Sequence, residues 1–311
     1  MEVNVAPAIS LSTRSQVLCV EFSPFEWSRM LLAVGLPTSV AVYSVKFKEE
    51  GDDDSEDCDQ VWEWHVSSQP VSLAWSPSSS LQAIPGCLQV AVASADNTVM
   101  QLSSDLGEAN TVQCVHTFIH MYTVGSYLNN FKKNKLYFLC ESLKLYSISQ
   151  ADGMMFYSLG MVVCFHPQDP DLLLVAEKKG VLRVYSVTSG CSTLFLRCPG
   201  PLLCADWSIP DPALIVAAGA KGLTVWNVAS LEAVEVGGVE RILALKVCRS
   251  TPGLVATQAA PHTVRVTHLH SNKIPIAVHL KVIGGMSWHQ NLPYLAVGSD
   301  RKILLWKIDN V

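Results

Sequence analysis

The sequence is poor in charged residues. Only 16% of its 311 residues are charged, while 49% are hydrophobic, whereas an average soluble domain has about 25% charged residues. The 22 basic and 27 acidic side chains leave a net charge of −5, and the densest basic cluster is the short run Lys132, Lys133 and Lys135. Binding to nucleic-acid phosphates needs many clustered positive charges. We therefore expect no direct contact with nucleic acid.

The sequence also lacks the marks of a secreted or membrane-inserted chain. Its first residues, MEVNVAPAISLSTR, contain no positively charged segment followed by an apolar one, which a signal peptide needs. The uncharged stretch Met30–Val45 is interrupted by Gly35 and Pro37, so it predicts two strands and no membrane insertion. No cysteines form a C-x-x-C pair, and we expect reduced thiols, as in the cytosol or nucleus.

Motifs for catalysis or cofactor binding are missing too. Gly284-Gly285 is not part of a phosphate-binding loop, and no G-x-S-x-G motif occurs. Asp169 and Asp171 flank a proline in a turn, where paired carboxylates are more often solvated than catalytic. His268 and His270 would share one face of a strand, but no third ligand lies nearby, as zinc requires. We expect no enzyme activity, no metal, no cofactor and no small-molecule substrate.

What the sequence does contain is a repeated unit, which is clearest at its C-terminal end. The stretch Ile283–Asn310 holds three short apolar runs, Gly284–Trp288, Tyr294–Val297 and Ile303–Ile308, separated by polar residues. Runs of this length, rich in β-branched and aromatic residues and split by turn formers, predict a β-meander. Asp300, in the second turn, can accept backbone N–H groups of its own turn.

The same unit recurs along the chain. In five copies an aromatic residue ends the first strand, at Phe22, Trp75, Phe165, Trp207 and Trp288. Val247 takes this place in a weaker copy, and the later copies follow one another at the period of roughly 40 residues that four-stranded propeller blades have. One further copy fits at Thr111–Ser149, with Tyr127 and Tyr146 at its aromatic positions, although its Asp turn is missing.

The predicted fold is therefore all-β, a seven-bladed β-propeller of the WD-repeat type that forms a single domain, residues 1–311. The blades are expected at residues 14–66, 67–118, 119–159, 160–198, 199–238, 239–281 and 282–311 plus 1–13. The segments between the units can serve as outer strands: Val61–Val66, Val112–Phe118, Met154–Leu159 and Ile274–Leu280. The last unit has only three strands, and an open sheet edge is a liability. We expect Asn4–Ser12 to pair there and close the ring.

Aromatic residues outside the strand pattern are the candidate contact sites. Phe25 and Trp27 lie in the turn after the first strand, and exposed aromatic side chains are enriched at interface hot spots. We therefore take both as candidate partner-binding residues. Trp62 and Trp64 share one strand face and are expected to pack between blades. The acidic segment Glu49–Asp59 is either a solvated loop, the usual outcome for blocks of like charge, or a docking site for a basic partner.

Two histidines are expected to have a role in turns. His166 and His289 directly follow strand-ending aromatic residues, in the place where Ser23 and Ser76 stand in sister copies.

The copies resemble WD repeats in a degenerate form. The terminal Trp-Asp pair is replaced, as in Trp226-Asn227 and Trp306-Lys307, so the His–Asp network of typical WD repeats cannot form. This pattern resembles the small WD-repeat nucleoporins, the thirty-seven-kilodalton class of the Y-shaped outer-ring subcomplex of the nuclear pore. The resemblance is carried by VEFSPFE (Val20–Glu26), LAWSP (Leu73–Pro77), SSDL (Ser103–Leu106), FHP with VAEKKGVLRVY (Phe165–Tyr185) and MSWHQNLPYLAVGSDRKILLW (Met286–Trp306). Residues Asn110–Tyr157 depart from the family pattern.

The resemblance implies a non-enzymatic scaffold subunit of the nuclear pore complex. Such proteins dock on the large helical scaffold nucleoporin of the Y complex and join its other subunits. They support pore assembly and the transport of mRNA and protein, and in mitosis they serve kinetochore attachment and chromosome segregation. The implied locations are the nuclear envelope and the mitotic kinetochore. The residues alone leave two alternatives open: a WD-repeat adaptor of another complex, such as a ubiquitin-ligase substrate receptor or a coat subunit, and a propeller enzyme or metal protein.

Overall fold

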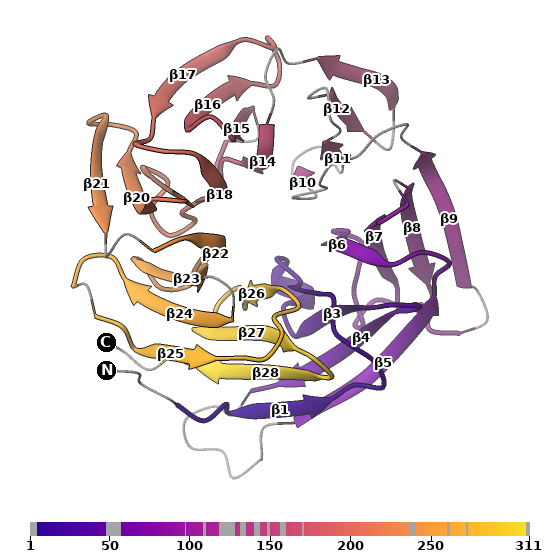
Figure 1. Cartoon of the computed structure of the whole chain (residues 1–311). Helices are drawn as coiled ribbons and strands as arrows, with labels where there is room; N and C mark the ends of the chain where they lie inside the picture. Colours follow the sequence, from indigo (N-terminus) through magenta and orange to yellow (C-terminus); the bar gives the residue numbers. More distant parts are fainter. Residues whose placement is uncertain are drawn as a thin grey trace. The chain divides into compact units, whose positions relative to one another are not determined.

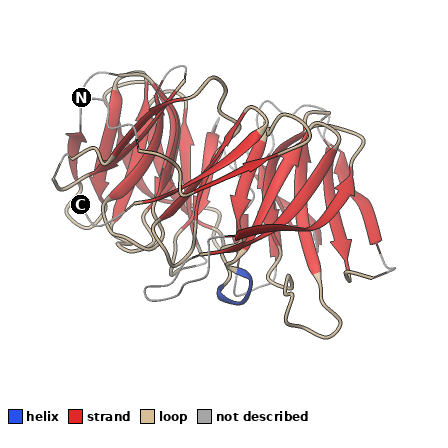
Figure 2. Ribbon diagram, turned by 90° about the horizontal axis from the view of Figure 1, so that it is seen from below, coloured by secondary structure: helices blue, strands red, loops and turns tan. Residues whose placement is uncertain are grey.

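The protein is built almost entirely of β-strands (Figure 1). The computed structural model describes residues 5–47, 57–96, 98–107, 110–117, 128–130, 135–139, 144–147, 150–155, 160–169, 171–236, 240–259, 262–271 and 273–308, with only the backbone described between 115 and 161. The described strands form seven antiparallel sheets of four strands each. The helix drawn in blue in Figure 2, the 3-10 turn η1 (Glu26–Ser28), is the only one in these ranges. The predicted fold class, a seven-bladed WD-type β-propeller, is confirmed.

The chain divides into two compact units. We call Ala6–Ile119 with Lys281–Asp309 the terminal unit, and His120–Leu280, with Met1–Val5 and Asn310–Val311, the middle unit. The predicted closure of one ring from residues 1–311 stays a prediction.

Three sheets form the terminal unit. The first contains β2 (Cys19–Phe22), β3 (Leu31–Leu36), β4 (Ser39–Lys46) and β5 (Asp57–His65). The second contains β6 (Pro70–Trp75), β7 (Leu88–Ser94), β8 (Thr98–Ser104) and β9 (Asn110–Thr117). The third contains β26 (Met286–Trp288), β27 (Tyr294–Ser299), β28 (Lys302–Lys307) and β1 (Ile9–Ser12).

Four sheets form the middle unit. The first contains β10 (Leu128–Asn130), β11 (Lys135–Leu139), β12 (Lys144–Ser147) and β13 (Gln150–Met155), and the second contains β14 (Gly160–Phe165), β15 (Leu172–Glu177), β16 (Val181–Ser186) and β17 (Ser192–Arg197). The third contains β18 (Leu202–Trp207), β19 (Leu214–Gly219), β20 (Gly222–Asn227) and β21 (Glu232–Val236). The fourth contains β22 (Ile242–Val247), β23 (Leu254–Ala259), β24 (Thr263–His268) and β25 (Ile276–His279).

The N-terminal strand completes the last sheet, as the sequence predicted. β1 runs antiparallel to β28, with Ile9 opposite Leu305 and Ser12 opposite Lys302. The backbone bonds Ala8 N to Leu305 O and Thr13 N to Arg301 O, both 2.8 Å, extend this pairing at each end. The strand is shorter than the predicted Asn4–Ser12, because it begins at Ile9. Its pairing removes the open edge that β28 would otherwise present.

Burial on both faces explains the runs of consecutive apolar residues. All six residues of β3 are buried, and so are five of the six residues of β27. Trp64 and Trp75 are almost fully buried in one core between the first and second sheets, and Trp62 packs against it. The expectation that Trp62 and Trp64 pack between blades is confirmed.

Two hydrogen bonds connect neighbouring sheets at equivalent places. In each, the acceptor is the side chain of the residue just before the aromatic residue that ends a first strand. Ser287 Oγ, in β26, accepts the backbone N–H of Phe22, in β2, at 2.9 Å. Asp206, in β18, accepts the N–H of Val247, in β22, at 2.9 Å. Burial raises the pKa of the Asp206 carboxyl, whereas the positive charge of Lys246 acts in the opposite direction.

The acidic segment and the degenerate third copy differ from the expectation in detail. β5 begins at Asp57 and not at Val61, so the last three residues of Glu49–Asp59 belong to a strand, paired with the end of β4. Residues 49–56 lie outside the described ranges. The further copy expected at Thr111–Ser149 contains the paired strands β11 and β12. Tyr127 lies outside the described residues, and the side chain of Tyr146 is not described.

Cysteines in the described ranges are free thiols. Burial raises the pKa of Cys19 to about 12, and it raises that of Cys204 as well. A thiol that stays protonated is a weak nucleophile, so these cysteines act as small apolar residues of the core.

The role of β1 can be tested by truncation. Deleting residues 1–13 should lower the free energy of unfolding by about 3–5 kcal/mol, because the ladder hydrogen bonds and the apolar contacts of Ile9 and Leu11 are lost together. Chemical denaturation followed by tryptophan fluorescence measures this loss. Deleting residues 1–4 keeps every bond described for β1 and is the control. Equal stability of both truncated proteins would contradict a structural role for β1.

Candidate functional site

The candidate site is built on the loop between β2 and β3, which carries both aromatic residues singled out in the sequence. Ser23 Oγ lies 2.7 Å from Ser28 Oγ and accepts the backbone N–H of Phe25 at 3.4 Å. Ser28 N donates to Phe25 O at 3.1 Å. These local bonds fold the loop into the single turn η1 and fix the direction of both aromatic side chains.

Phe25 and Trp27 lie together, but only one of them faces solvent. Phe25 is 1% exposed and belongs to the core between the first two sheets, while Trp27 is 48% exposed. Their rings are stacked, with centroids 5.4 Å apart and an interplanar angle of 20°. The buried Phe25 ring therefore packs against the inner face of the Trp27 ring and is not accessible to a partner. Contact of a partner with Trp27 stays a prediction.

A hydrogen bond to the second sheet holds Trp27 from another side. Its indole Nε1 donates to the carbonyl oxygen of Pro77, two residues after β6, at 3.0 Å. The ring is thus fixed in position before any partner arrives. A fixed aromatic side chain loses little conformational entropy on binding, which favours affinity.

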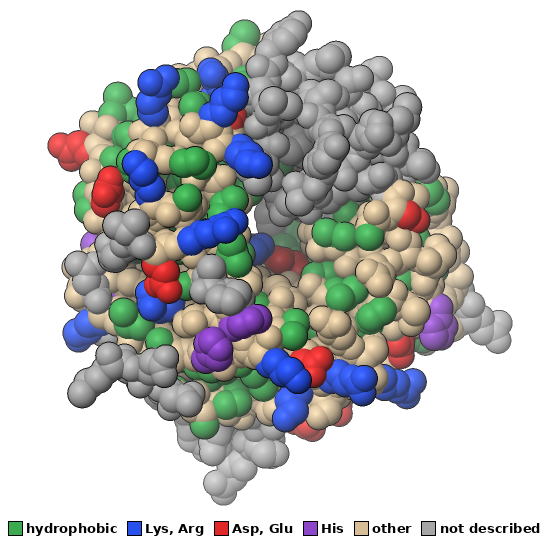
Figure 3. All heavy atoms as spheres, in the orientation of Figure 1, with side chains coloured by type: hydrophobic (Ala, Val, Ile, Leu, Met, Phe, Trp, Pro, Cys, Tyr) green, Lys and Arg blue, Asp and Glu red, His purple; other side chains and the backbone are tan. Residues whose placement is uncertain are grey.

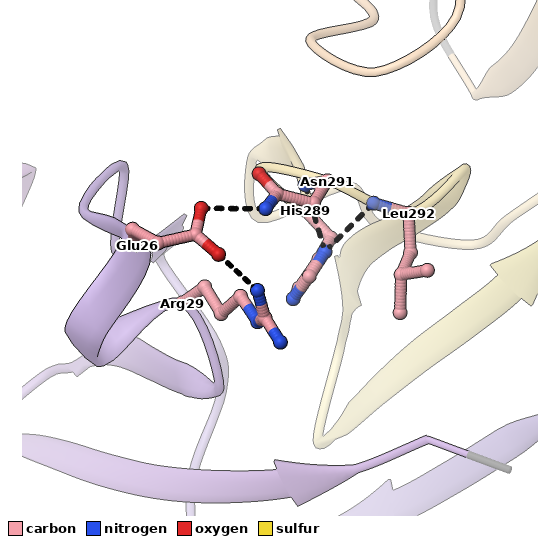
Figure 4. A network of polar contacts seen from close by, with 5 residues as sticks. All are labelled: Glu26, Arg29, His289, Asn291 and Leu292. Atoms are coloured by element: carbon pink, nitrogen blue, oxygen red, sulfur yellow. Dashed lines mark hydrogen bonds and ion pairs between the residues drawn. The ribbon is translucent and has the colours of Figure 1, made fainter. Parts of the chain in front are cut away.

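Polar side chains beside Trp27 form a network centred on Glu26 (Figure 4). Glu26 pairs with Arg29 through one carboxylate oxygen, and its other oxygen accepts the side-chain N–H of Asn291 at 2.6 Å. Asn291 comes from the β26–β27 loop of the last sheet, so the network joins the first and last sheets. Its one negative and one positive side chain balance, which leaves this surface without net charge.

His289 holds the loop that carries Asn291. Its Nδ1 accepts the backbone N–H groups of Asn291 at 3.2 Å and Leu292 at 3.0 Å. The ring is buried and packs edge-on against Phe22 and Phe47, at 5.4 and 4.8 Å between centroids. Burial, and to a lesser extent the positive charge of Arg29, lower the pKa of His289 to about 4. The imidazole is therefore neutral near pH 7.

The same arrangement recurs at the equivalent histidine of the middle unit. His166 Nδ1 accepts the backbone N–H groups of Gln168 and Asp169 at 3.2 and 2.9 Å. Burial lowers its pKa as well, although Asp169 acts in the opposite direction. In the sister copies, the hydroxyls of Ser23 and Ser76 accept the corresponding N–H groups. The predicted role of these histidines in turns is confirmed.

Further exposed apolar side chains lie on the β26–β27 and β6–β7 loops, which are bonded to Glu26 and Trp27 through Asn291 and Pro77. Leu292 is 37% exposed in the β26–β27 loop, next to Asn291. The β6–β7 loop continues from Pro77 to Leu81 and Ile84, which are 37% and 100% exposed. All these loops join a first strand to a second strand. We define the Trp27 surface as Glu26, Trp27, Arg29, Pro77, Asn291 and Leu292.

The remaining candidates of the sequence do not form a chemical site. His268 Nδ1 accepts the backbone N–H of Ser271 at 3.3 Å, so this histidine has a turn role too. Its ring lies 5.6 Å from that of His270. No group of three potential metal ligands occurs in the described ranges, and within them no helix is long and apolar enough to cross a membrane. The absence of a bound metal stays a prediction.

Sequence reasoning missed the polar half of the Trp27 surface. Glu26 and Asn291 are 265 positions apart, and neither belongs to a local motif. Their only signal is that both follow a first-strand aromatic residue by a few positions, Glu26 in the first copy and Asn291 in the last.

The pH dependence of stability tests the role of His289. Its folded-state pKa of about 4 lies below the usual 6.5. The contribution of the neutral His289 ring to the free energy of unfolding is therefore complete above pH 6.5. As the pH falls from 6.5 to 4 the free energy of unfolding should drop by about 3 kcal/mol, because the unfolded chain binds the proton first. In the variant His289→Asn, the amide oxygen can replace Nδ1 as acceptor without titrating. The variant should be less stable at pH 7, because the ring is missing, but should lose less stability than the wild type between pH 6.5 and 4.

Chemical denaturation at several pH values measures this pH dependence of stability, with the exposed His65→Asn as control. Identical pH profiles for wild type and His289→Asn would contradict the account.

Comparison with known proteins agrees with the WD-repeat fold of the structure. The family model "WD domain, G-beta repeat" matches residues 56–101 and 274–307. Nucleoporin Nup37 of Drosophila melanogaster is 27% identical, and the alignment covers 99% of this chain and 99% of that protein. Nucleoporin Nup37 of Mus musculus and of Homo sapiens are each 26% identical, over 96% of this chain and 96% of each relative. The predicted resemblance to small WD-repeat nucleoporins is thus confirmed. It supports a non-enzymatic WD-repeat scaffold of the nucleoporin type.

Proposed function

We propose that the protein is a scaffold subunit of the outer-ring Y subcomplex of the nuclear pore and docks on its large helical nucleoporin. The observation that carries this proposal is the similarity to three Nup37 nucleoporins over nearly the full length of both chains. Similarity that includes every blade favours a shared assembly role over a shared fold alone. The proposal extends to pore assembly, to transport of mRNA and protein, and to kinetochore attachment and chromosome segregation in mitosis.

The Trp27 surface is the proposed contact with the helical partner. It combines an exposed, positionally fixed indole with the apolar side chain of Leu292 and a polar network whose charges are already balanced. Such a surface does not attract a strongly charged partner, and it offers a hot-spot aromatic residue of the kind that dominates many interfaces. An apolar helix face, rimmed by neutral polar side chains, is the matching partner surface.

The identity of the stoichiometric partner tests the proposed function. Affinity purification of the tagged full-length chain from cells of its natural source, followed by mass spectrometry, should recover nuclear-pore Y-complex subunits, with the large helical nucleoporin in equal amount. The location at the nuclear envelope and at mitotic kinetochores is tested by imaging of the same tagged chain. Recovery of ubiquitin-ligase or coat subunits without any nuclear-pore component would refute the proposal and favour an adaptor role.

Salt dependence tests the nature of the contact. The complex should survive a rise in ionic strength from about 0.15 M to about 0.5 M, because salt screens exposed ion pairs and leaves buried apolar contacts intact. Deleting residues 49–56, the part of the acidic segment that precedes β5, should weaken binding little. Analytical size exclusion at both salt concentrations measures this. A complex that dissociates after this deletion alone would assign the contact to the acidic segment.

Substitution of Trp27 tests the docking surface. Trp27→Ala should weaken the complex by about tenfold to a hundredfold, the usual range for an aromatic hot spot. Trp27→Phe keeps the stacking on Phe25 but loses the bond to Pro77, so its effect should be intermediate. Val234→Ala, an exposed apolar residue of β21, is the control. Binding measured by calorimetry that is equal for all three variants and the wild type would rule out the Trp27 surface.

A further inference from the structure

A second surface, on the middle unit, is rich in positive charge and is independent of the proposed function. Lys178 and Lys179 are exposed in the turn between β15 and β16, Arg197 is exposed at the end of β17, and Lys221 is exposed in the turn between β19 and β20. Figure 3 shows Lys and Arg side chains gathered over the sheets β14–β17 and β18–β21. We call Lys178, Lys179, Phe195, Arg197 and Lys221 the basic surface.

Strand register brings these residues together from three segments. Arg197 lies opposite Val181, the first residue after the turn with Lys178 and Lys179. Cys198 N donates to Gly180 O at 2.8 Å, which holds the end of β17 on this turn. The side chain of Lys221 passes so close to Gly200 that an added Cβ there would lie 3.0 Å from Lys221 Cδ. The two turns and the end of β17 therefore place the four cations on neighbouring segments.

An exposed aromatic ring lies at the centre of this charge. Phe195 is 46% exposed, and the guanidinium carbons of Arg183 and Arg197 lie 4.8 and 5.9 Å from its ring centroid. Arg183 is neutralised by Glu177, since its Nε lies 2.6 Å from the Glu177 carboxylate. No carboxylate in the described ranges forms an ion pair with Lys178, Lys179, Arg197 or Lys221. In the next sheet, Glu232 and Glu235 stand on the outer strand β21.

The backbone beside Phe195 is the edge of a sheet. β17 is the last strand of its sheet and pairs with β16 alone among the described strands. An exposed edge of this kind can pair with an extended peptide, whose alternate side chains then contact the neighbouring surface. Like charges held close together repel each other, so their proximity is relieved when a ligand of opposite charge binds.

We propose that the basic surface binds an acidic, extended segment of a partner protein. The segment lies along β17, its carboxylates face Lys178, Lys179, Arg197 and Lys221, and an apolar side chain covers Phe195. A peptide fits better than a nucleic acid, because the chain as a whole carries a charge of −5 and the cations form one patch beside a strand edge. The acidic character of the segment is the specific claim.

Fluorescence anisotropy with the full-length protein tests the proposal. The probe is a labelled peptide of about twelve residues in which Glu and Asp alternate with Leu and Val, compared with the same peptide carrying Gln and Asn. Binding of the acidic peptide alone is expected, and it should weaken at high salt. The double variant Lys178→Glu, Lys179→Glu should reduce affinity about tenfold or more, because two attractive contacts become repulsive. Phe195→Ala should also reduce affinity.

Matched variants and probes decide between the proposal and its rivals. The control variant Arg301→Glu, Lys302→Glu makes the same change of net charge at the end of the β27–β28 turn and the start of β28, and it should leave affinity unchanged. Equal weakening in the control would show unspecific attraction and overturn the proposal. Tighter binding of a single-stranded oligonucleotide than of the acidic peptide would overturn it in favour of a nucleic acid. Peptide binding that appears only after residues 49–56 are deleted would assign the surface to the chain's own acidic segment.

Discussion

The approach of the first and last sheets at Val17 is the constraint on which the terminal unit depends. An added Cβ on Gly284 would overlap the carbonyl oxygen of Val17, and the N–H of Val17 donates to Asp300 O at 2.6 Å. Glycine is therefore required at Gly284 by close backbone contact and not by a phosphate ligand. Together with β1 on β28 and Ser287 on Phe22, this contact sets the β2–β3 loop beside the β26–β27 loop.

The Trp27 surface follows from this arrangement. Glu26 can accept the hydrogen bond from Asn291 only because the two sheets lie in this register, and neutral His289 holds the turn that presents Asn291. The core beneath supplies Phe25, on which the Trp27 ring is stacked. A rigid scaffold with a fixed, uncharged and partly apolar surface is the arrangement expected of a protein whose work is docking. The proposal that this docking takes place in the nuclear pore rests on the similarity to Nup37 nucleoporins.

Much of the fold could be predicted from the sequence, because each blade repeats the same physical pattern. An apolar strand ending in an aromatic residue, a polar turn and a second apolar strand identify each copy, and the missing fourth strand of the last copy predicts the pairing of β1. Phe25 could not be identified as a core residue, since a turn aromatic gives the same pattern whether it points inward or outward. The start of β5 at Asp57 was missed because acidic residues are poor strand formers, and pairing with β4 overrides that preference.

The basic surface was missed for a different reason. Its residues come from two turns and the end of one strand, and only Lys178 and Lys179 are adjacent in sequence. A count of charge along the chain points instead to Lys132, Lys133 and Lys135. Clustering in three dimensions depends on the register of β16 with β17 and on the close passage of Lys221 by Gly200. Repeats fix the strands of a propeller, but the residues on its turns and outer edges are free to differ, and function is expected there.

Hydrogen exchange, compared between the free protein and the natively purified assembly, tests the central claim that the Trp27 surface is the docking site. The account predicts that the amides of the β2–β3 and β26–β27 loops, around Glu26 to Ser28 and Asn291 to Leu292, exchange more slowly in the assembly. Loops and strand edges remote from this surface that touch no partner should exchange at the rate of the free protein. Unchanged exchange in both loops, in an assembly where other segments become protected, would contradict it.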